Sequence, residues 1–274
     1  GESDPYGVQR YITGATSIDD TRQNSGKLKL SYEFGDHLRA LYTLGYWQNR
    51  SDIGYESYLR DTTGASVLSG TVDVGGGRRI TVPATSFGLQ RQLLDHRLQG
   101  LEISGKREGF VWQLTGSAYD YLQDARRKQN AASSPAGTLT TFDGTGWRTL
   151  DAKLTWGETQ KTLRSHQLTI GLHQDQYVLE SLVRNLVDWQ HSTTGNRASA
   201  FSGQTRTSAI FVQDAWAFAP AWKATMGLRA EQWSADHGRV SGSTTTQVFA
   251  DRRANHLSPK LALQWQPAPD WRLT

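Results

Sequence analysis

The stretch Lys27–Trp47, KLKLSYEFGDHLRALYTLGYW, alternates apolar and polar residues on both sides of a Gly35-Asp36 pair. The apolar residues at every second position are Leu28, Leu30, Tyr32 and Phe34 before the pair, and Leu38, Ala40, Tyr42, Leu44 and Tyr46 after it. A period of two places successive side chains on opposite faces of an extended chain. The stretch therefore predicts a β-hairpin with a tight Gly-Asp turn and one apolar face.

The same alternation recurs through most of the chain. It covers segments 110–119, 150–156, 167–173, 224–231 and 260–265, and less regularly 99–105, where only Leu101 and Ile103 are in phase, and 208–218, which is apolar on both faces. Apart from Asp214, the apolar positions carry no charge, whereas the opposite positions carry nearly all the charged residues of these segments. About ten strands are expected, and the last is cut short at Thr274. A soluble β-sandwich would show the same division, so alternation alone leaves both architectures open.

The lengths of the connections separate the two architectures. Every second connection is short: 35–36, 107–109, 220–221 and 267–270, with a somewhat longer one at 157–165. The others are long and polar: 51–93, 122–144, 178–205 and 234–255. Long loops are uncommon inside compact domains. Short periplasmic turns that alternate with long extracellular loops are typical of outer-membrane barrels.

Aromatic residues concentrate at two levels of the expected strands. Those near the short connections are Tyr32, Phe34, Phe110, Trp112, Trp156, Trp216, Phe218, Trp222, Trp265 and Trp271. Those near the long connections are Tyr46, Trp47, Tyr119, Tyr121, Trp147, Tyr177 and Trp233. Two aromatic girdles are expected at the two membrane–water interfaces. The sequence therefore predicts an all-β, antiparallel transmembrane β-barrel, with about ten strands of a larger barrel.

Composition excludes several functions. The chain of 274 residues has 30 Lys and Arg against 26 Asp and Glu, a net charge of +4 that argues against nucleic acid as a partner. It has 0 Cys, which excludes a disulfide scaffold, Cys-ligated zinc and a thiol nucleophile. No metalloprotease, P-loop, dinucleotide or nucleophile-elbow motif occurs. We expect no enzyme activity, no catalytic residue, no metal site and no cofactor.

The carboxy-terminal part resembles a known family. Segment 207–218 contains Phe-Val-Gln-Asp-Ala-Trp, 222–229 ends in Gly-Leu-Arg, and 256–267 contains Ser-Pro-Lys-Leu, followed by Asp-Trp at 270–271. In this order the segments resemble the "FxQDxW", "LxxGLR" and "SPKLxLxxxP…DW" strands of TonB-dependent outer-membrane receptors. The clear resemblance covers residues 146–274, and the weaker strand pattern extends it to most of the chain.

The resemblance implies a 22-stranded barrel, an amino-terminal plug and a segment that engages TonB. Residues 1–274 are then one partial barrel domain, without the plug and the carboxy-terminal strands. The implied function is active, TonB-dependent uptake of a scarce bulky nutrient, with a ferric siderophore as the leading substrate. The implied location is the outer membrane of a Gram-negative bacterium, and the implied partners are the TonB complex, outer-membrane lipid and lipopolysaccharide. A passive porin-like channel and a soluble, secreted carbohydrate-binding β-protein remain alternatives.

Ligand contacts in such a fold are expected on the lumen face near the outer rim. Trp47, Tyr119, Tyr177 and Trp233 occupy that level, and aromatic surfaces with a few polar groups suit a bulky ligand. Arg229 is a further candidate on the lumen face, where it shares its strand with Glu231. Each of the four aromatic residues can also be a girdle or packing residue, and Arg229 can instead pair with its neighbours.

Four other motifs have a functional and a structural interpretation. His173 and Asp175 could be metal ligands, but a hydrogen-bonded pair in the lumen is favoured. The glycine-rich stretch 75–79 could hold a phosphate, but a hairpin turn or loop tip is favoured. Basic residues at 126–128 and 252–253 could contact lipopolysaccharide or an anionic ligand, but solvated loops are favoured.

Overall fold

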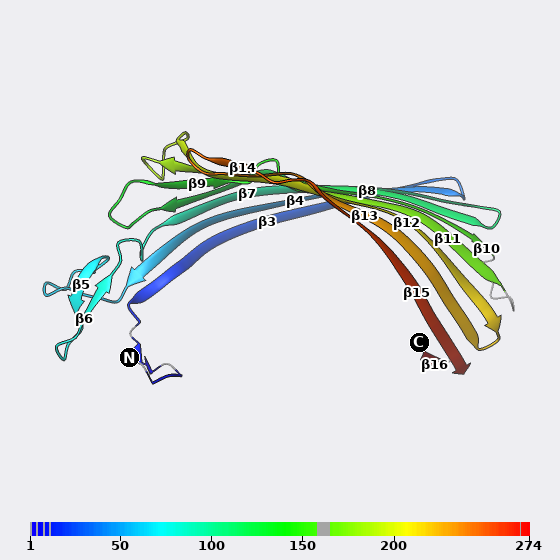
Figure 1. The fold of residues 1–274 in the computed structure, drawn as a ribbon, viewed down its shortest axis with the longest axis horizontal. Coiled ribbons are helices and arrows are strands. Elements are labelled where there is room, and N and C mark those ends of the chain that lie inside the picture. Colours follow the sequence, from blue (N-terminus) through cyan, green and yellow to red (C-terminus); the bar gives the residue numbers. More distant parts are fainter. Residues whose placement is uncertain (1, 4, 8, 11, 158–164, 269) are drawn as a thin grey trace.

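The computed structural model describes residues 2–3, 5–7, 9–10, 12–157, 165–268 and 270–274, and forms an arched antiparallel sheet (Figure 1). Its strands are β1 (Glu2–Ser3), β2 (Gln9–Arg10), β3 (Gly14–Phe34), β4 (Leu38–Ser57), β5 (Gly70–Asp73), β6 (Arg79–Val82), β7 (Gln90–Arg107), β8 (Phe110–Gln129), β9 (Gly137–Thr141), β10 (Gly146–Gly157), β11 (His166–Leu186), β12 (Asn196–Ala219), β13 (Trp222–Ser241), β14 (Thr246–Val248), β15 (Arg252–Ala268) and β16 (Trp271–Leu273). In this part of the chain no helix is long and apolar enough to cross a membrane.

Strands that follow one another along the chain are neighbours in the sheet. The main path runs β3-β4-β7-β8-β10-β11-β12-β13-β15-β16, ten strands in all, within a sheet of 12 that also includes β9 and β14. All the pairings are antiparallel. The predicted number of about ten strands, with a short final one, is confirmed.

The register places the alternating residues on two distinct faces. Across five strands, Ala152, Leu172, Ile210, Ala230 and Leu257 are successive partners on one face. We call this the apolar face, and the opposite side, which includes Lys29, Lys153 and Lys260, the polar face. Large side chains of the apolar face remain exposed, for example Leu257 at 65% and Leu261 at 77%. So large an exposed apolar surface requires an apolar cover.

The described short connections lie within one residue of their predicted bounds, at 35–37, 108–109 and 220–221. Gly35 has a φ of 66°, and Glu108 and Gly109 have φ values of 42° and 84°. Two successive residues with positive φ are typical of a type I′ turn, whose twist matches that of the flanking strands. Pro220 and Ala221 alone separate β12 from β13. The expected connections 157–165 and 267–270 include residues outside the described part of the chain.

The predicted lengths of the long connections were wrong. Strand β4 continues to Ser57, β8 to Gln129, β11 to Leu186 and β13 to Ser241, and their partners begin correspondingly early. The alternation marks the stretch in which one face of the sheet is apolar and the other polar. It ends where both faces become polar in β4, β8 and β13, and in β11 it gives way to apolar residues without a strict period. Backbone pairing does not depend on that pattern, so the ladder continues beyond it.

The buried apolar residues lie mostly beyond the alternating segments. They include Phe87, Leu94, Leu139, Leu186 and Trp189. Short elements pack there: β9 pairs with both β8 and β11, and β14 pairs with β13. The molecule thus carries its packed core at the end of the sheet where the long connections lie, which we call the outer end.

Candidate ligand-binding surface

An aromatic row crosses the outer end of the polar face. It consists of Trp47 on β4, His96 on β7, Tyr119 and Tyr121 on β8, Trp147 on β10, and Tyr177 on β11. Trp47 is the register partner of His96, and Trp147 is the partner of both Tyr119 and Tyr177. Three of the four predicted aromatic contacts therefore lie in one row, joined by His96 and Trp147.

Ring contacts hold this aromatic row together. The rings of Tyr119 and Trp147 stack with centroids 4.3 Å apart, and Tyr177 follows at 6.5 Å from Trp147. His96 stacks on Tyr121 at 3.9 Å and meets Trp47 at 5.1 Å. The His96 Nδ1 atom lies 3.0 Å from the Tyr119 hydroxyl, within hydrogen-bond distance. Stacked rings on neighbouring strands lose little freedom when they bind a ligand, so the surface is preorganised.

An ion pair of β8, with a buried carboxylate and a half-exposed guanidinium, adjoins the row. Asp124 is fully buried, and both of its carboxylate oxygens accept hydrogen bonds from Arg126, at 2.9 and 3.1 Å. Its Oδ2 atom also lies 3.6 Å from Nε2 of His96. The Arg126 guanidinium in turn covers the ring of Phe142 at 4.9 Å. Arg126 thus holds the Asp124 carboxylate close to the imidazole of His96.

The prediction that residues 126–128 form a solvated loop was wrong, because all three lie in β8. Arg127 donates hydrogen bonds to the carbonyl oxygens of Trp189 and Ser192, at 3.0 and 2.9 Å. The strand continues here because β7 and β9 pair with it on its two sides. The arginines thus have structural partners within the chain.

A cavity of about 440 Å³ adjoins the row at Tyr177. Its lining includes Trp233 on β13, Phe249 before β15, and Arg252 at the start of β15. The fourth predicted aromatic residue, Trp233, thus shares a cavity with Tyr177. Arg252 was also expected in a loop, but it pairs with Ala235 of β13 and adds a cation to this aromatic cavity. The volume lies within the range of small-molecule sites.

Arg229 lies apart from the aromatic row and outside the lining of this cavity. Its guanidinium binds Glu231, with Nη2 2.8 Å and Nε 2.9 Å from Oε2. The geometry thus matches the pairing with Glu231 that the sequence offered as the alternative to ligand contact. The prediction of Arg229 as a ligand contact stays a prediction.

Sequence reasoning missed several members of this surface. His96 sits between Asp95 and Arg97, where no alternation marks a strand, and Phe249 lies in an expected loop. Trp147 was expected only as a girdle aromatic. Trp147 lies within the row because it pairs with Tyr119 on one side and with Tyr177 on the other.

The His173 and Asp175 pair is hydrogen-bonded, as favoured from the sequence. Nδ1 of His173 lies 2.7 Å from Asp151 and Nε2 lies 3.1 Å from Asp175, so both ring nitrogens have carboxylate partners. Among the residues that the structure describes, no group of three or more His, Cys, Asp or Glu is arranged to hold a metal ion. The glycine-rich stretch forms the turn between β5 and β6, where Gly75, Gly76 and Gly77 have φ values of 92°, 63° and 74°. The hairpin interpretation is confirmed.

The sheet defines a class of protein: one wall of a transmembrane β-barrel, with an apolar and a polar face. A family model described as "TonB dependent receptor-like, beta-barrel" matches residues 35–274. The chain therefore belongs to the TonB-dependent receptor family, within its barrel domain. No curated protein gives a significant match.

Solved structures share the fold at low sequence identity. The ferric preacinetobactin receptor from Acinetobacter baumannii is 12% identical with a TM-score of 0.55, over 92% of this chain and 38% of that one. The ferripyoverdine receptor of the outer membrane of Pseudomonas aeruginosa is 14% identical with a TM-score of 0.54, over 92% of this chain and 34% of that one. This chain thus spans little more than a third of the length of these receptors.

Proposed function

We propose that the chain is part of an outer-membrane receptor for active, TonB-dependent uptake of a ferric siderophore in a Gram-negative bacterium. Residues 1–274 form one partial barrel domain in this proposal. The apolar face lies against lipid and the polar face lines the lumen. Membership of the family supports the receptor class, and the solved relatives, named for ferric siderophores, support the ligand class. The observation that carries the proposal is the aromatic row at the outer end of the polar face.

The aromatic row and the adjoining cavity would capture the ligand together. Trp147 and Tyr177 offer ring faces to the planar and apolar parts of a bulky chelate, and Arg252 offers a charge to an anionic part. No bond is made or broken in this step. The complete receptor would couple to TonB through a plug segment, whose movement would open the lumen that the polar face lines.

The test uses the complete gene in a strain that lacks its own copy. We expect growth under iron limitation and uptake of iron-loaded siderophore, both dependent on TonB. Trp147→Ala combined with Tyr177→Ala removes two ring contacts, each worth about 0.5–1.5 kcal/mol, and should weaken binding about ten-fold. Trp156→Ala is the matched control, because Trp156 belongs to the apolar face and is 56% exposed.

Three results would contradict the proposal. Uptake that persists without TonB would indicate a passive channel. A product found in the soluble fraction, with affinity for carbohydrate, would indicate a secreted binding protein. Binding that is unchanged in the double variant would remove the aromatic row from the ligand site.

A further inference from the structure

A row of arginines crosses the apolar face at its outer boundary. Arg148, Gln176, Arg206, Ser234 and Arg253 are successive register partners on β10, β11, β12, β13 and β15. The three arginines therefore occupy every second strand on one face, with roughly 10 Å between the strands that carry them. Arginine is not expected on a face that contacts lipid unless it lies at the level of the headgroups.

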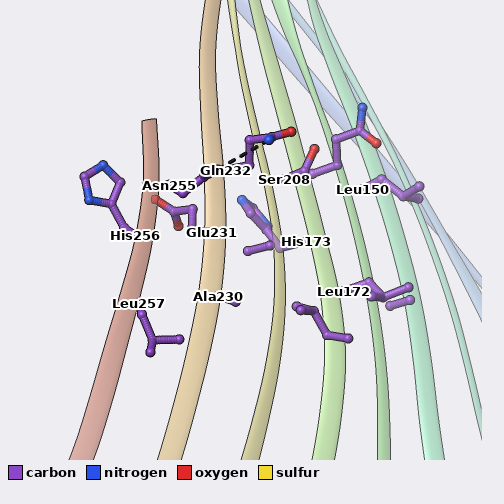
Figure 2. Close-up of a pocket in the computed structure, with 14 residues that line it drawn as sticks. Leu150, Leu172, His173, Ser208, Ala230, Glu231, Gln232, Asn255, His256 and Leu257 are labelled. Atoms are coloured by element: carbon purple, nitrogen blue, oxygen red, sulfur yellow. Dashed lines mark hydrogen bonds between the residues drawn. The ribbon is translucent and has the colours of Figure 1, made fainter. Parts of the chain in front are cut away.

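A hollow of about 810 Å³ adjoins this arginine row on the side of the short turns. Figure 2 shows the residues that line it. It spans the next two register rows toward the short turns, from β10 to β15. Its inner row consists of Ala152, Leu172, Ile210, Ala230 and Leu257. The small side chains of Ala152 and Ala230 leave space beside the larger ones of this row. At its outer end, the Gln232 amide donates a hydrogen bond to Asn255 at 3.3 Å. The inner row is thus apolar and the row at the boundary mostly polar, and His173, Glu231 and His256, from the intervening positions, complete the lining.

The boundary carries a surplus of positive charge. Arg97 and Arg148 flank Asp120, with nitrogen–oxygen distances of 3.1 and 2.8 Å. The Asp236 carboxylate lies 2.7 Å from Nδ1 of His237 and within electrostatic reach of Arg206. With Arg253, four arginines face two aspartates, so the net charge of this band is 4 − 2 = +2. Each guanidinium has five N–H donors, and Arg148 is bonded to Asp120 through Nη2 alone, with its side chain 58% exposed.

We propose that the arginine row and the hollow form a binding site for lipopolysaccharide of the outer leaflet. The lipid phosphates pair with Arg148, Arg206 and Arg253, and an acyl chain fills the hollow below them. This assignment rests on the proposed outer-membrane location. The site faces the bilayer, which excludes a soluble partner, and its positive charge favours a phosphorylated lipid over a neutral one.

The first test measures the lipid that remains bound to the complete receptor after purification in detergent. The variant Arg148→Gln/Arg206→Gln/Arg253→Gln removes the row. Each basic residue near an anionic lipid surface strengthens binding roughly five-fold, so we expect at least about ten-fold less lipid A per protein. The control Lys29→Gln/Lys153→Gln/Lys260→Gln removes the same charge from the polar face and should retain the wild-type amount. Equal retention by the two triple variants would overturn the proposal.

A second test uses only the wild-type receptor and does not depend on the folding of a variant. The delipidated protein is titrated with lipid A, with dephosphorylated lipid A and with inorganic phosphate. We expect the dephosphorylated lipid to bind at least about ten-fold more weakly, and inorganic phosphate not to compete at millimolar concentration. Equal affinity for the two lipids, or competition by free phosphate, would overturn the lipid site. A receptor absent from the outer-membrane fraction would instead refute the proposed location.

Discussion

Apolar side chains are exposed in one region of the sheet and buried in the other. The exposed region is the part between the short turns and the arginine row, which we call the spanning part, and the buried region is the outer end. On β11, Ile170 and Leu172 of the apolar face are 45% and 56% exposed. At the outer end, Phe87, Leu186 and Trp189 are 2%, 3% and 5% exposed. The outer end packs against itself, whereas the spanning part leaves its apolar surface for the surroundings to cover. The two regions should therefore respond differently to the same kind of substitution and to the removal of lipid.

The largest effect is expected from Phe87→Ala. The ring of Phe87 packs on Tyr55 with centroids 5.4 Å apart, and a Cβ atom on Gly14 would come within 2.9 Å of it. Emptying a buried phenylalanine site costs about 3–5 kcal/mol. Because this core is internal, the loss should be similar in detergent and in lipid vesicles, as measured by equilibrium unfolding of the complete receptor. Tyr58→Ala is the control, since Tyr58 is 51% exposed. A loss confined to vesicles would mean that the outer end is not an independent core.

The second-largest effect is expected in the spanning part, and unlike the first it should depend on the presence of lipid. Ile170→Arg places a charge on the apolar face of β11, between the level of Trp156 and the middle of the span. Lipid contact there should cost less than the value of about 2–4 kcal/mol expected at the midplane, but clearly more than the cost at the interface. The neighbouring Thr169→Arg points to the polar face and should cost little. The difference between the two variants should be large in lipid vesicles and small in detergent that hydrates the side chain. Equal costs for both variants would contradict the assignment of the two faces.

The same contrast explains what the sequence could predict. The hairpin in Lys27–Trp47 and the strands after it were predictable, because a sheet with one apolar and one polar face has apolar residues at every second position. The extensions of β4, β8 and β13 were not, because strands that are polar on both faces carry no such pattern, and the extension of β11 has apolar residues without a period of two. The placement of Trp47, Tyr119, Tyr177 and Trp233 near the outer end was also predictable, because they lie next to the long connections in the sequence.

The other contacts of the site depend on the register between strands, which the sequence does not reveal. The contact between His96 and Tyr121 depends on a register shift between Asp95 and His96, which no local signal marks. The cavity at Trp233 depends on where the segment with Phe249 lies relative to β11. The arginine row was likewise hidden, because Arg148, Arg206 and Arg253 are far apart in the chain and become neighbours only through four successive pairings.

The smallest effect concerns a turn at the outer end. The Asp188 carboxylate accepts hydrogen bonds from the His191 ring at 2.9 Å and from the backbone N–H groups of Gln190 and His191 at 2.8 and 3.1 Å. These bonds, with the His191 side chain first, hold the pKa of Asp188 below its usual value of 3.8. A depressed folded-state pKa means that the stabilisation is fully present above the unfolded pKa and is lost as the pH falls through the folded one.

Hydrogen exchange at the amides of Gln190 and His191 measures this turn directly. Asp188→Ala should speed exchange modestly near neutral pH, and the difference from the wild type should narrow as the pH falls below about 3.8, as the depressed pKa requires. Asp61→Ala removes a comparable carboxylate, bonded to Thr63 in another loop, and should leave the 188–192 turn unchanged. A difference that is independent of pH would mean that the turn depends on the shape of Asp188 and not on its charge. The 188–192 turn would then owe its stability to packing and not to the charge of Asp188, which would sharpen the contrast between the packed outer end and the exposed apolar face.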